Sequence, residues 1–200
     1  MADRNEDIKQ LVDQMSENPT AVAEVVAQLS DAPRRDRQTA AAALRQVAKN
    51  DASVLVEYIP QLIDALNRPE AQTRWECLET LTLLVPFDSR ACNKAIPEAE
   101  TALFDEESGP VRLGAMRFLC KLGATTAARS EKVWPLIDEG IQCYHGDLEF
   151  NDMMTAVIDF SKGKLGDEVK TSLADRMSFD AENAKGALQR RAQQVIDNLA

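Results

Sequence analysis

The sequence predicts an all-α protein built from repeated pairs of helices. A proline-centred segment recurs at nearly constant spacing, and apolar residues follow one another at steps of three and four. Alternating strand-like runs bounded by hairpin turns are absent from the sequence. A period of roughly 20–50 residues is typical of a repeat array, in which each unit must stack on its neighbours to bury its apolar face.

The proline segment shows the period most clearly. "YIPQLIDAL" around Pro60 is followed by "AIPEAETAL" around Pro97 and "VWPLIDEGI" around Pro135, at spacings of 37 and 38 residues. A proline inside a helix costs about 3 kcal/mol. Its recurrence therefore indicates a bend in the first helix of each unit, offset by burial of large apolar side chains at about 1.5–3 kcal/mol each.

The second helix of each unit carries an apolar stripe. Arg37, Arg74 and Arg112 are also 37 and 38 residues apart, and Asn151 and Lys185 are looser equivalents. Residues three, seven and ten positions after these five share one helical face. They are Ala40, Leu44 and Val47; Cys77, Leu81 and Leu84; Ala115, Leu119 and Leu122; Met154, Ile158 and Ser161; and Leu188, Ala192 and Val195.

These patterns predict a single domain over residues 1–200. A capping helix lies within 1–17, near residues 5–15, and helix pairs fill 18–199. The five pairs span approximately 18–51, 52–87, 88–126, 129–163 and 165–199. Pro19, Pro69 and Pro110 suit first helical positions, and Ser53, Asp147 and Asp180 suit N-caps.

The chain resembles the HEAT-repeat family in two features of the repeat. A proline bends the first helix, and an acidic or amide residue in the turn is followed by an arginine early in the second helix. Asn67/Arg74 and Asp105/Arg112 fit the spacing, and Asp31/Arg37 is one residue short. The resemblance implies a right-handed α-α superhelix, a short HEAT-like solenoid in which these side chains form a ladder between repeats. The fourth and fifth pairs depart from it by lacking the arginine.

Composition narrows the function classes. The chain is 44% hydrophobic with a formal net charge of −10, which opposes long-range attraction to nucleic acid or anionic lipid. No apolar run approaches the ~18 residues of a membrane span, and the polar start predicts no secretory signal. We expect a cytoplasmic protein. The four cysteines (Cys77, Cys92, Cys120 and Cys143) lack CxxC spacing and are expected to be reduced.

No catalytic constellation emerges, so we predict no enzyme, no cofactor and no metal site. The only histidine, His145, stands in "CYHGD" at a predicted helix end. "DLEFND" resembles the start of a calcium loop, but Asp152 and Ile158 replace the required glycine and glutamate. Phosphate-loop and HExxH motifs are absent from the sequence.

Candidate binding residues lie opposite the core stripe of the second helices. These are Trp75, Glu79, Leu83, Leu113, Arg117, Lys121, Asp152 and Phe160. The second helices of such solenoids usually line the concave surface, where an apolar strip edged by charge is typical of a protein-binding site. Alternatively, tight packing buries Trp75, Leu83, Leu113 and Phe160 as additional core.

One basic cluster also stands out. Arg34, Arg35 and Arg37 begin the second helix of the first pair, and Arg45 and Lys49 follow. Positive charge in the first turn opposes the helix dipole. The cluster fits either an anionic partner or an ordinary solvated face.

The sequence thus favours a non-catalytic scaffold whose concave face binds a protein or peptide, as a monomer or weak homo-oligomer. One alternative is a HEAT-like DNA-binding enzyme of the alkylated-base glycosylase type, with Trp75 and Asp152 or Asp159 at the lesion. Its cationic groove is not evident in this acidic sequence. Another alternative is a HEAT protein similar to bilin lyases, which no particular residue selects.

Overall fold

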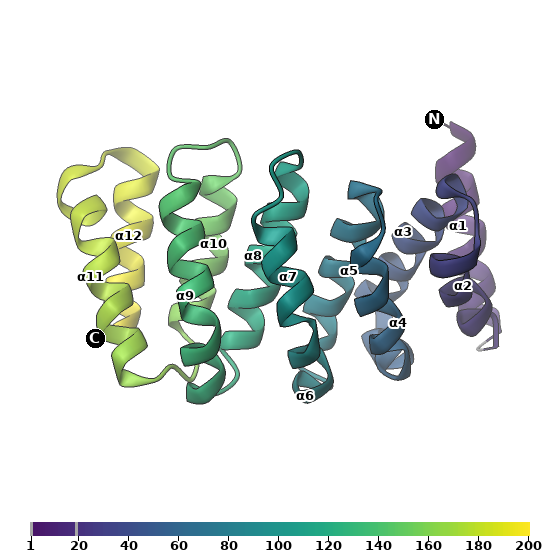
Figure 1. Cartoon of the computed structure of the whole chain (residues 1–200), viewed down its shortest axis with the longest axis horizontal. Helices are drawn as coiled ribbons and strands as arrows, with labels where there is room; N and C mark the ends of the chain where they lie inside the picture. The colour runs from purple at the N-terminus through teal and green to yellow at the C-terminus, as the bar shows by residue number, and fades with distance from the viewer. Residues whose placement is uncertain (1, 19) are drawn as a thin grey trace. The chain divides into compact units, whose positions relative to one another are not determined.

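A computed structural model of the chain describes residues 2–18 and 20–200, where every regular element is helical (Figure 1). Pro19 lies outside the described residues, so its predicted place at a helix start stays a prediction. The chain forms two compact units, residues 1–102 and 103–200. None of the helices in the described ranges is long and apolar enough to cross a bilayer.

Unit 1 contains the capping helix and the first two helix pairs, and it begins the third pair. Its α-helices are α1 (Ala2–Glu17), α2 (Thr20–Asp31), α3 (Arg34–Asp51), α4 (Ile59–Asp64), α5 (Ala71–Leu84), α6 (Ser89–Cys92) and α7 (Ile96–Leu103), the last of which ends one residue into unit 2. Short 3-10 segments occupy Ala52–Tyr58, Ala65–Asn67 and Asn93–Ala95. These helices begin and end within a few residues of the limits expected for the first two pairs, 18–51 and 52–87.

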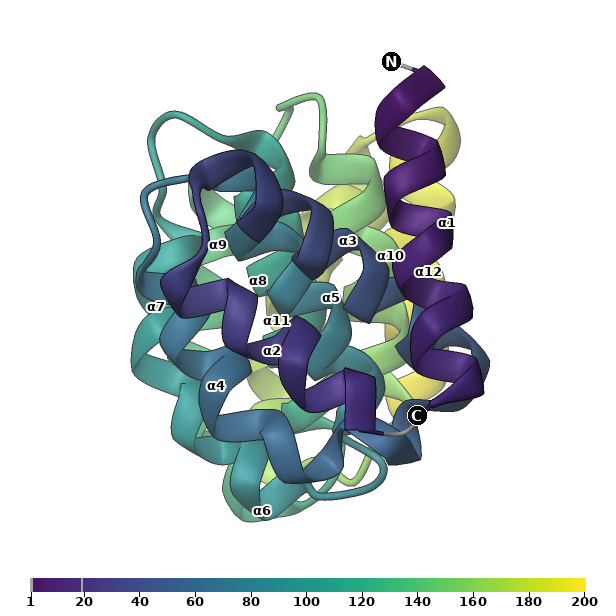
Figure 2. The same ribbon diagram turned by 90° about the vertical axis from the view of Figure 1, so that its right-hand side faces the viewer.

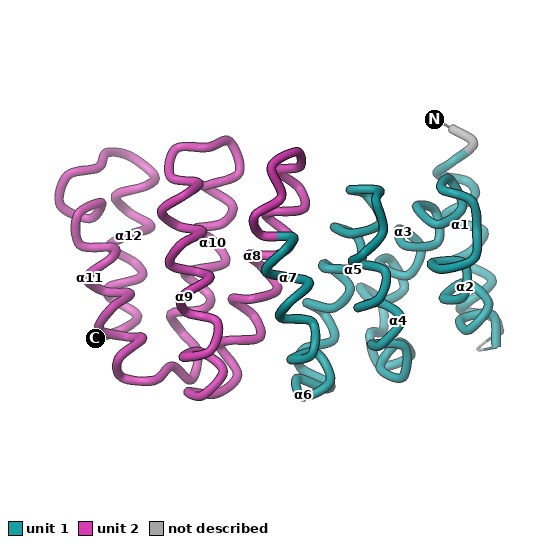
Figure 3. The backbone as a smooth tube through the Cα atoms, viewed as in Figure 1, with its two compact units in different colours: residues 1–102 teal, residues 103–200 magenta. Residues whose placement is uncertain are grey.

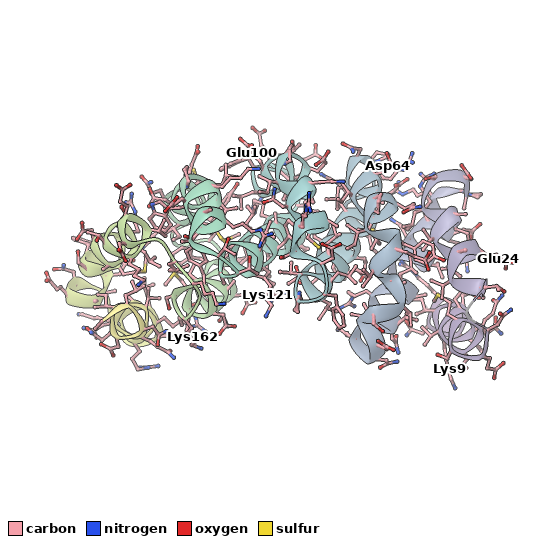
Figure 4. All side chains as sticks on the ribbon, turned by 90° about the horizontal axis from the view of Figure 1, so that it is seen from below. Lys9, Glu24, Asp64, Glu100, Lys121 and Lys162 are labelled. Atoms are coloured by element: carbon pink, nitrogen blue, oxygen red, sulfur yellow. The ribbon has the colours of Figure 1, made fainter. Side chains whose placement is uncertain are left out.

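The helices of unit 1 form two layers. Helix α1 packs beside α3, and α3 packs beside α5, so the capping helix occupies the place of a second helix (Figure 2). Helices α2 and α4 form the other layer. Asp64 of α4 and Glu100 of α7 lie on one side of the unit, whereas Lys9 of α1 lies on the opposite side (Figure 4).

Unit 2, magenta in Figure 3, repeats the arrangement with five α-helices of twelve or more residues each. They are α8 (Gly109–Gly123), α9 (Ala127–Cys143), α10 (Phe150–Ser161), α11 (Asp167–Asn183) and α12 (Gly186–Leu199). Helices α8, α10 and α12 pack in sequence as one layer, and α9 and α11 form the other. We call the layer formed by the second helices of the pairs the second-helix layer of each unit.

The predicted apolar stripe forms the core between the two layers. Of its fifteen residues all are buried except Leu188, which is half-buried near the start of the last helix. Leu44 and Leu81 are fully buried in unit 1, as are Ala115 and Leu119 in unit 2. The steps of three and four therefore identified the buried face correctly in every pair.

The repeated prolines occupy two different settings. Pro60 and Pro97 are the second residues of α4 and α7, each of which follows a 3-10 segment. There the missing N–H falls in the first turn of the α-helix, where it costs little. Only Pro135 lies inside a continuous α-helix, α9. In the second and third pairs, a change from 3-10 helix to α-helix therefore takes the place of the bend that the sequence predicts.

Several predicted helix starts are corrected. Pro110 lies in the first turn of α8, as predicted, but Pro69 precedes α5 by two residues. Asp51, not Ser53, caps the helix after α3, because its carboxylate accepts hydrogen bonds from the Ser53 N–H and hydroxyl. The N-cap position of α10 is Glu149 and not Asp147. Asp180 lies inside α11.

Two of the repeated arginines, Arg37 and Arg112, link neighbouring helix pairs, as the HEAT resemblance implies. The carboxylate partner, however, comes from the next pair along the chain. Arg37 pairs with Glu70, and Arg112 pairs with Glu149. Asp105 contributes its backbone carbonyl, which accepts a hydrogen bond from Arg112 Nη1 at 2.9 Å.

Candidate functional site

The second-helix layer of unit 1 presents a tryptophan that is neither core nor fully exposed. Trp75 on α5 is half-buried, and so are Glu79 and Leu83, one and two turns further along. Arg45 of α3 places its guanidinium carbon 5.2 Å from the centre of the Trp75 ring. At that distance a cation is attracted by the negative face of the indole.

A buried carboxylate fixes this arginine. Glu76 follows Trp75 on α5, is 2% exposed, and forms an ion pair with Arg45. Burial raises the pKa of Glu76 by more than the charge and hydrogen bond of Arg45 lower it. An ionised carboxylate at this depth requires its cationic partner, because an unpaired buried charge is strongly unfavourable.

Sequence reasoning did not identify Glu76. The available signal was the triplet "WEC", in which an acid directly precedes the core residue Cys77. Such an acid stands next to the buried stripe and needs a cation from an adjacent helix. Position eight of the preceding second helix, Arg45, supplies it.

The second-helix layer of unit 2 is more strongly charged. Leu113 and Arg117 on α8 are half-buried, whereas Lys121 of α8 and Asp152 of α10 are exposed. Lys121 and Lys162 project along the same side of the unit (Figure 4). Four of the predicted residues in this unit are therefore accessible, and they combine one apolar side chain with charges of both signs.

Phe160 corrects the predicted strip. It is 0% exposed, so it belongs to the core of unit 2 and cannot contact a partner. The reason is Gly123 at the end of α8: a Cβ on this glycine would lie 2.8 Å from Phe160 Cε2 and 2.5 Å from a Val133 methyl carbon. The missing side chain makes room for the phenyl ring. For Phe160 the alternative interpretation, additional core, is right.

The basic cluster of the first pair is largely paired with acids of unit 1. Arg35 lies 3.2 Å from an Asp7 oxygen across an exposed contact with α1. Arg37 pairs with Glu70, and Arg45 pairs with Glu76 as described. Three of the five basic residues therefore take part in ion pairs within the unit, which favours an ordinary part of the fold over an anionic partner there.

The histidine has a structural partner in unit 2. His145 Nε2 lies 3.2 Å from each carboxylate oxygen of Asp180, and the imidazole packs on Phe150 with ring centres 4.9 Å apart. This contact joins the turn after α9 to α11. Within residues 2–18 and 20–200, no group of three or more His, Cys, Asp or Glu side chains is placed to hold a metal ion.

No protein-family model and no curated protein matches the sequence. Solved structures do match the fold. A designed armadillo repeat protein in complex with the peptide (KR)4 superposes with a TM-score of 0.76 at 14% identity, covering 96% of this chain and 91% of that one. A computationally designed armadillo repeat protein for modular peptide recognition gives 0.73 at 15% identity, covering 96% and 91%. An engineered protein gives 0.73 at 13% identity, covering 100% and 97%.

These similarities extend over nearly the whole chain, and at such low identity they concern the fold. Together with the repeated helix pairs they show that the chain is an all-α, HEAT/armadillo-like helical repeat solenoid, as the sequence predicts.

Proposed function

We propose that this helical-repeat solenoid is a non-catalytic scaffold that binds an extended segment of a protein or peptide on its second-helix layers. The observation that carries the proposal is Trp75, a half-exposed indole held in place by Arg45, which the buried Glu76 holds in turn. Residues 1–200 act together as one binding domain. The protein works in the cytoplasm as a monomer or weak homo-oligomer.

A fixed aromatic side chain suits a binding anchor. Tryptophan is among the residues that most often dominate binding energy at protein interfaces. A side chain whose rotamer is already set loses little conformational entropy when a partner binds. Because Arg45 already contacts the indole in the free protein, binding of the partner does not have to order this side chain. Glu79, one turn along, offers a carboxylate to a neighbouring side chain of the partner.

The accessible residues of unit 2 would orient the bound segment of the partner. Leu113 offers an apolar contact, while Arg117, Lys121 and Asp152 offer charges of both signs on α8 and α10. Charges at the rim of an interface contribute to specificity and association rate more than to affinity. The formal net charge of −10 favours a partner segment that is positive overall.

The structural neighbours support this type of partner. One of them is a designed armadillo repeat protein in complex with a peptide, and another was designed for modular peptide recognition. They share the fold and not the sequence, so the support concerns the use of the scaffold and leaves the partner's sequence open.

The proposal is tested by selecting peptides of about twelve residues from a random display library and measuring each binder by fluorescence polarisation. Trp75→Ala and Leu113→Ala are expected to weaken binding about tenfold or more, as interface anchors do. Phe87→Ala is the matched control, because this aromatic is 54% exposed and lies after α5, outside the proposed site. Circular dichroism verifies that all variants are equally helical.

Selected peptides that bind the Trp75→Ala and Leu113→Ala variants as tightly as the wild type would overturn the proposal. A parallel titration with duplex DNA over increasing salt tests the glycosylase-like alternative. Binding that falls steeply with salt would favour that alternative, because phosphate contacts release counterions.

A further inference from the structure

Unit 1 contains a cleft away from the Trp75 site. It is formed by the end of α1, the start of α2, the end of α3 and the 3-10 segment Ala52–Tyr58, and its volume is about 450 Å³. This size is within the usual range for small-molecule sites, about 300–1,000 Å³.

The floor of the cleft is apolar. Met15, Val22 and Val47 line it, and each of them is otherwise buried in the core. Val54 forms part of the wall and, at 41%, is one of four large apolar side chains that stay exposed among the residues that the structure describes. A ligand with an apolar body would remove the exposed surface of Val54 from water, at about 25 cal/mol for each Å² buried.

The charged side chains of the cleft are all acidic. Among the described residues of its lining, Asp51 and Glu57 are the carboxylates, and none is a lysine, arginine or histidine. Asp51 is held in place, since its Oδ1 accepts hydrogen bonds from the Ser53 N–H at 2.9 Å and from the Ser53 hydroxyl at 2.6 Å. These hydrogen bonds lower the pKa of Asp51, which keeps the carboxylate ionised at neutral pH.

We propose that this cleft binds a small organic cation, an alkyl- or arylalkylammonium whose apolar body lies on Met15, Val22 and Val47 and whose ammonium lies between Asp51 and Glu57. Burial of Val54 and van der Waals contact with the apolar floor supply binding energy, and the two carboxylates select against neutral and anionic ligands of the same shape. The site shares no residue with the proposed peptide-binding surface. The cation-binding proposal can therefore fail while the peptide-binding proposal holds, and the reverse.

Three probes with one apolar body test this inference. 4-Phenylbutylamine, 4-phenylbutanol and 5-phenylvalerate share the phenylbutyl body and differ in the polar end group, which is cationic, neutral and anionic respectively. Each is titrated into the ¹⁵N-labelled full chain by NMR. The amine is expected to bind about fivefold more tightly than the alcohol, which is the strength of a partly exposed ion pair, and the carboxylate more weakly than both. The perturbed amide signals should include those of Val47 and Val54.

Variants assign the selectivity to the two acids. Asp51→Asn retains an oxygen that can accept from Ser53, and Glu57→Gln changes an exposed side chain. The variant with both substitutions should bind the amine no better than the alcohol. The control is Asp64→Asn, because Asp64 is an exposed acid of α4 outside the cleft; this variant should keep the preference for the amine over the alcohol. If Asp51→Asn disturbs folding, Glu57→Gln alone should still reduce the preference.

Equal affinity for all three probes, no binding up to millimolar amine, or a preference that survives both substitutions would each overturn the inference. Each of these results would leave the peptide-binding proposal untouched, because that proposal depends on Trp75 and Leu113.

Discussion

Arg112 of α8 forms an ion pair with Glu149, the residue that immediately precedes α10, and both side chains are largely buried. The same guanidinium donates a hydrogen bond to the Asp105 carbonyl, and its carbon lies 5.0 Å from the centre of the Tyr144 ring. Tyr144 in turn donates its hydroxyl to the Leu103 carbonyl at 2.7 Å. Through these contacts Arg112 connects α8 with three segments of unit 2: the loop at Asp105, the turn at Tyr144 and the start of α10 at Glu149.

Replacing this arginine should destabilise the protein measurably. Arg112→Ala is expected to lower the free energy of unfolding by about 1.5–3 kcal/mol, since it removes charge-assisted hydrogen bonds and leaves Glu149 without its cation. Urea unfolding followed by circular dichroism measures the change. Lys162→Ala is the control in the same unit: its pair with Asp159 is solvent-exposed, and we expect a loss below about 0.5 kcal/mol. Equal losses for both variants would contradict the prediction.

Two buried glutamates of unit 1 should give opposite dependences on pH. Burial alone would raise the pKa of Glu70, but its hydrogen bonds and the charge of Arg37 bring it below the ordinary value of 4.5. The ionised form therefore stabilises the folded state above pH 4.5, and this stability is lost as the pH falls through the folded pKa. The stability advantage of wild type over Glu70→Gln should shrink on acidification.

Glu76 has the reverse sign. Burial raises its pKa above 4.5, so the folded state holds this proton more tightly than the unfolded state does. The stability of wild type relative to Glu76→Gln should fall as the pH rises from 4.5 through the folded pKa. Unfolding curves for the three proteins at a series of pH values measure both slopes. Slopes of the same sign would contradict the prediction, because they would mean that burial outweighs pairing at both glutamates or at neither.

Two glycines of unit 2 should respond differently to the same substitution. A Cβ at Gly163 would lie 2.6 Å from the Ala124 Cα and 2.7 Å from its carbonyl oxygen, which also accepts the Lys164 N–H. Backbone cannot yield cheaply, so Gly163→Ala should cost more than about 1 kcal/mol. A Cβ at Gly140 meets mainly the flexible end of Met116.

Gly140→Ala should therefore stay within about 1 kcal/mol of wild type, helped by the better helix propensity of alanine in α9. Thermal unfolding of both variants provides the measurement. A larger loss at Gly140 than at Gly163 would contradict the prediction.

The cysteines should differ sharply in reactivity. Cys77, Cys92 and Cys120 are buried, whereas Cys143 at the end of α9 is exposed. Burial raises the pKa of Cys77 and of Cys120, which further reduces their reactive thiolate form. Maleimide labelling followed by mass spectrometry should modify Cys143 alone in the native protein and all four after denaturation. Rapid native labelling of Cys77 or Cys120 would contradict the structure.

The sequence by itself determined the fold class and the buried face of each second helix. These depend on local order: a helix turns by about 100° per residue, so steps of three and four place Leu44 and Leu81 on the buried stripe whatever surrounds them. The proline period located the first helices for the same reason. Helical periodicity also places Trp75, Leu113 and Lys121 opposite the stripe, but it left open whether Trp75 and Leu113 are accessible or buried.

Tertiary structure decided everything that depends on a neighbouring helix. Glu70 and Glu149 meet arginines 33 and 37 residues earlier, and no local pattern selects them over the acids in the arginines' own repeats. Glu76 is buried because α3 supplies Arg45, and Phe160 is core because Gly123 leaves space for its ring. Helical periodicity fixes the direction of a side chain, but the packing of the adjacent helix determines whether that direction ends in solvent, in an ion pair or in the core.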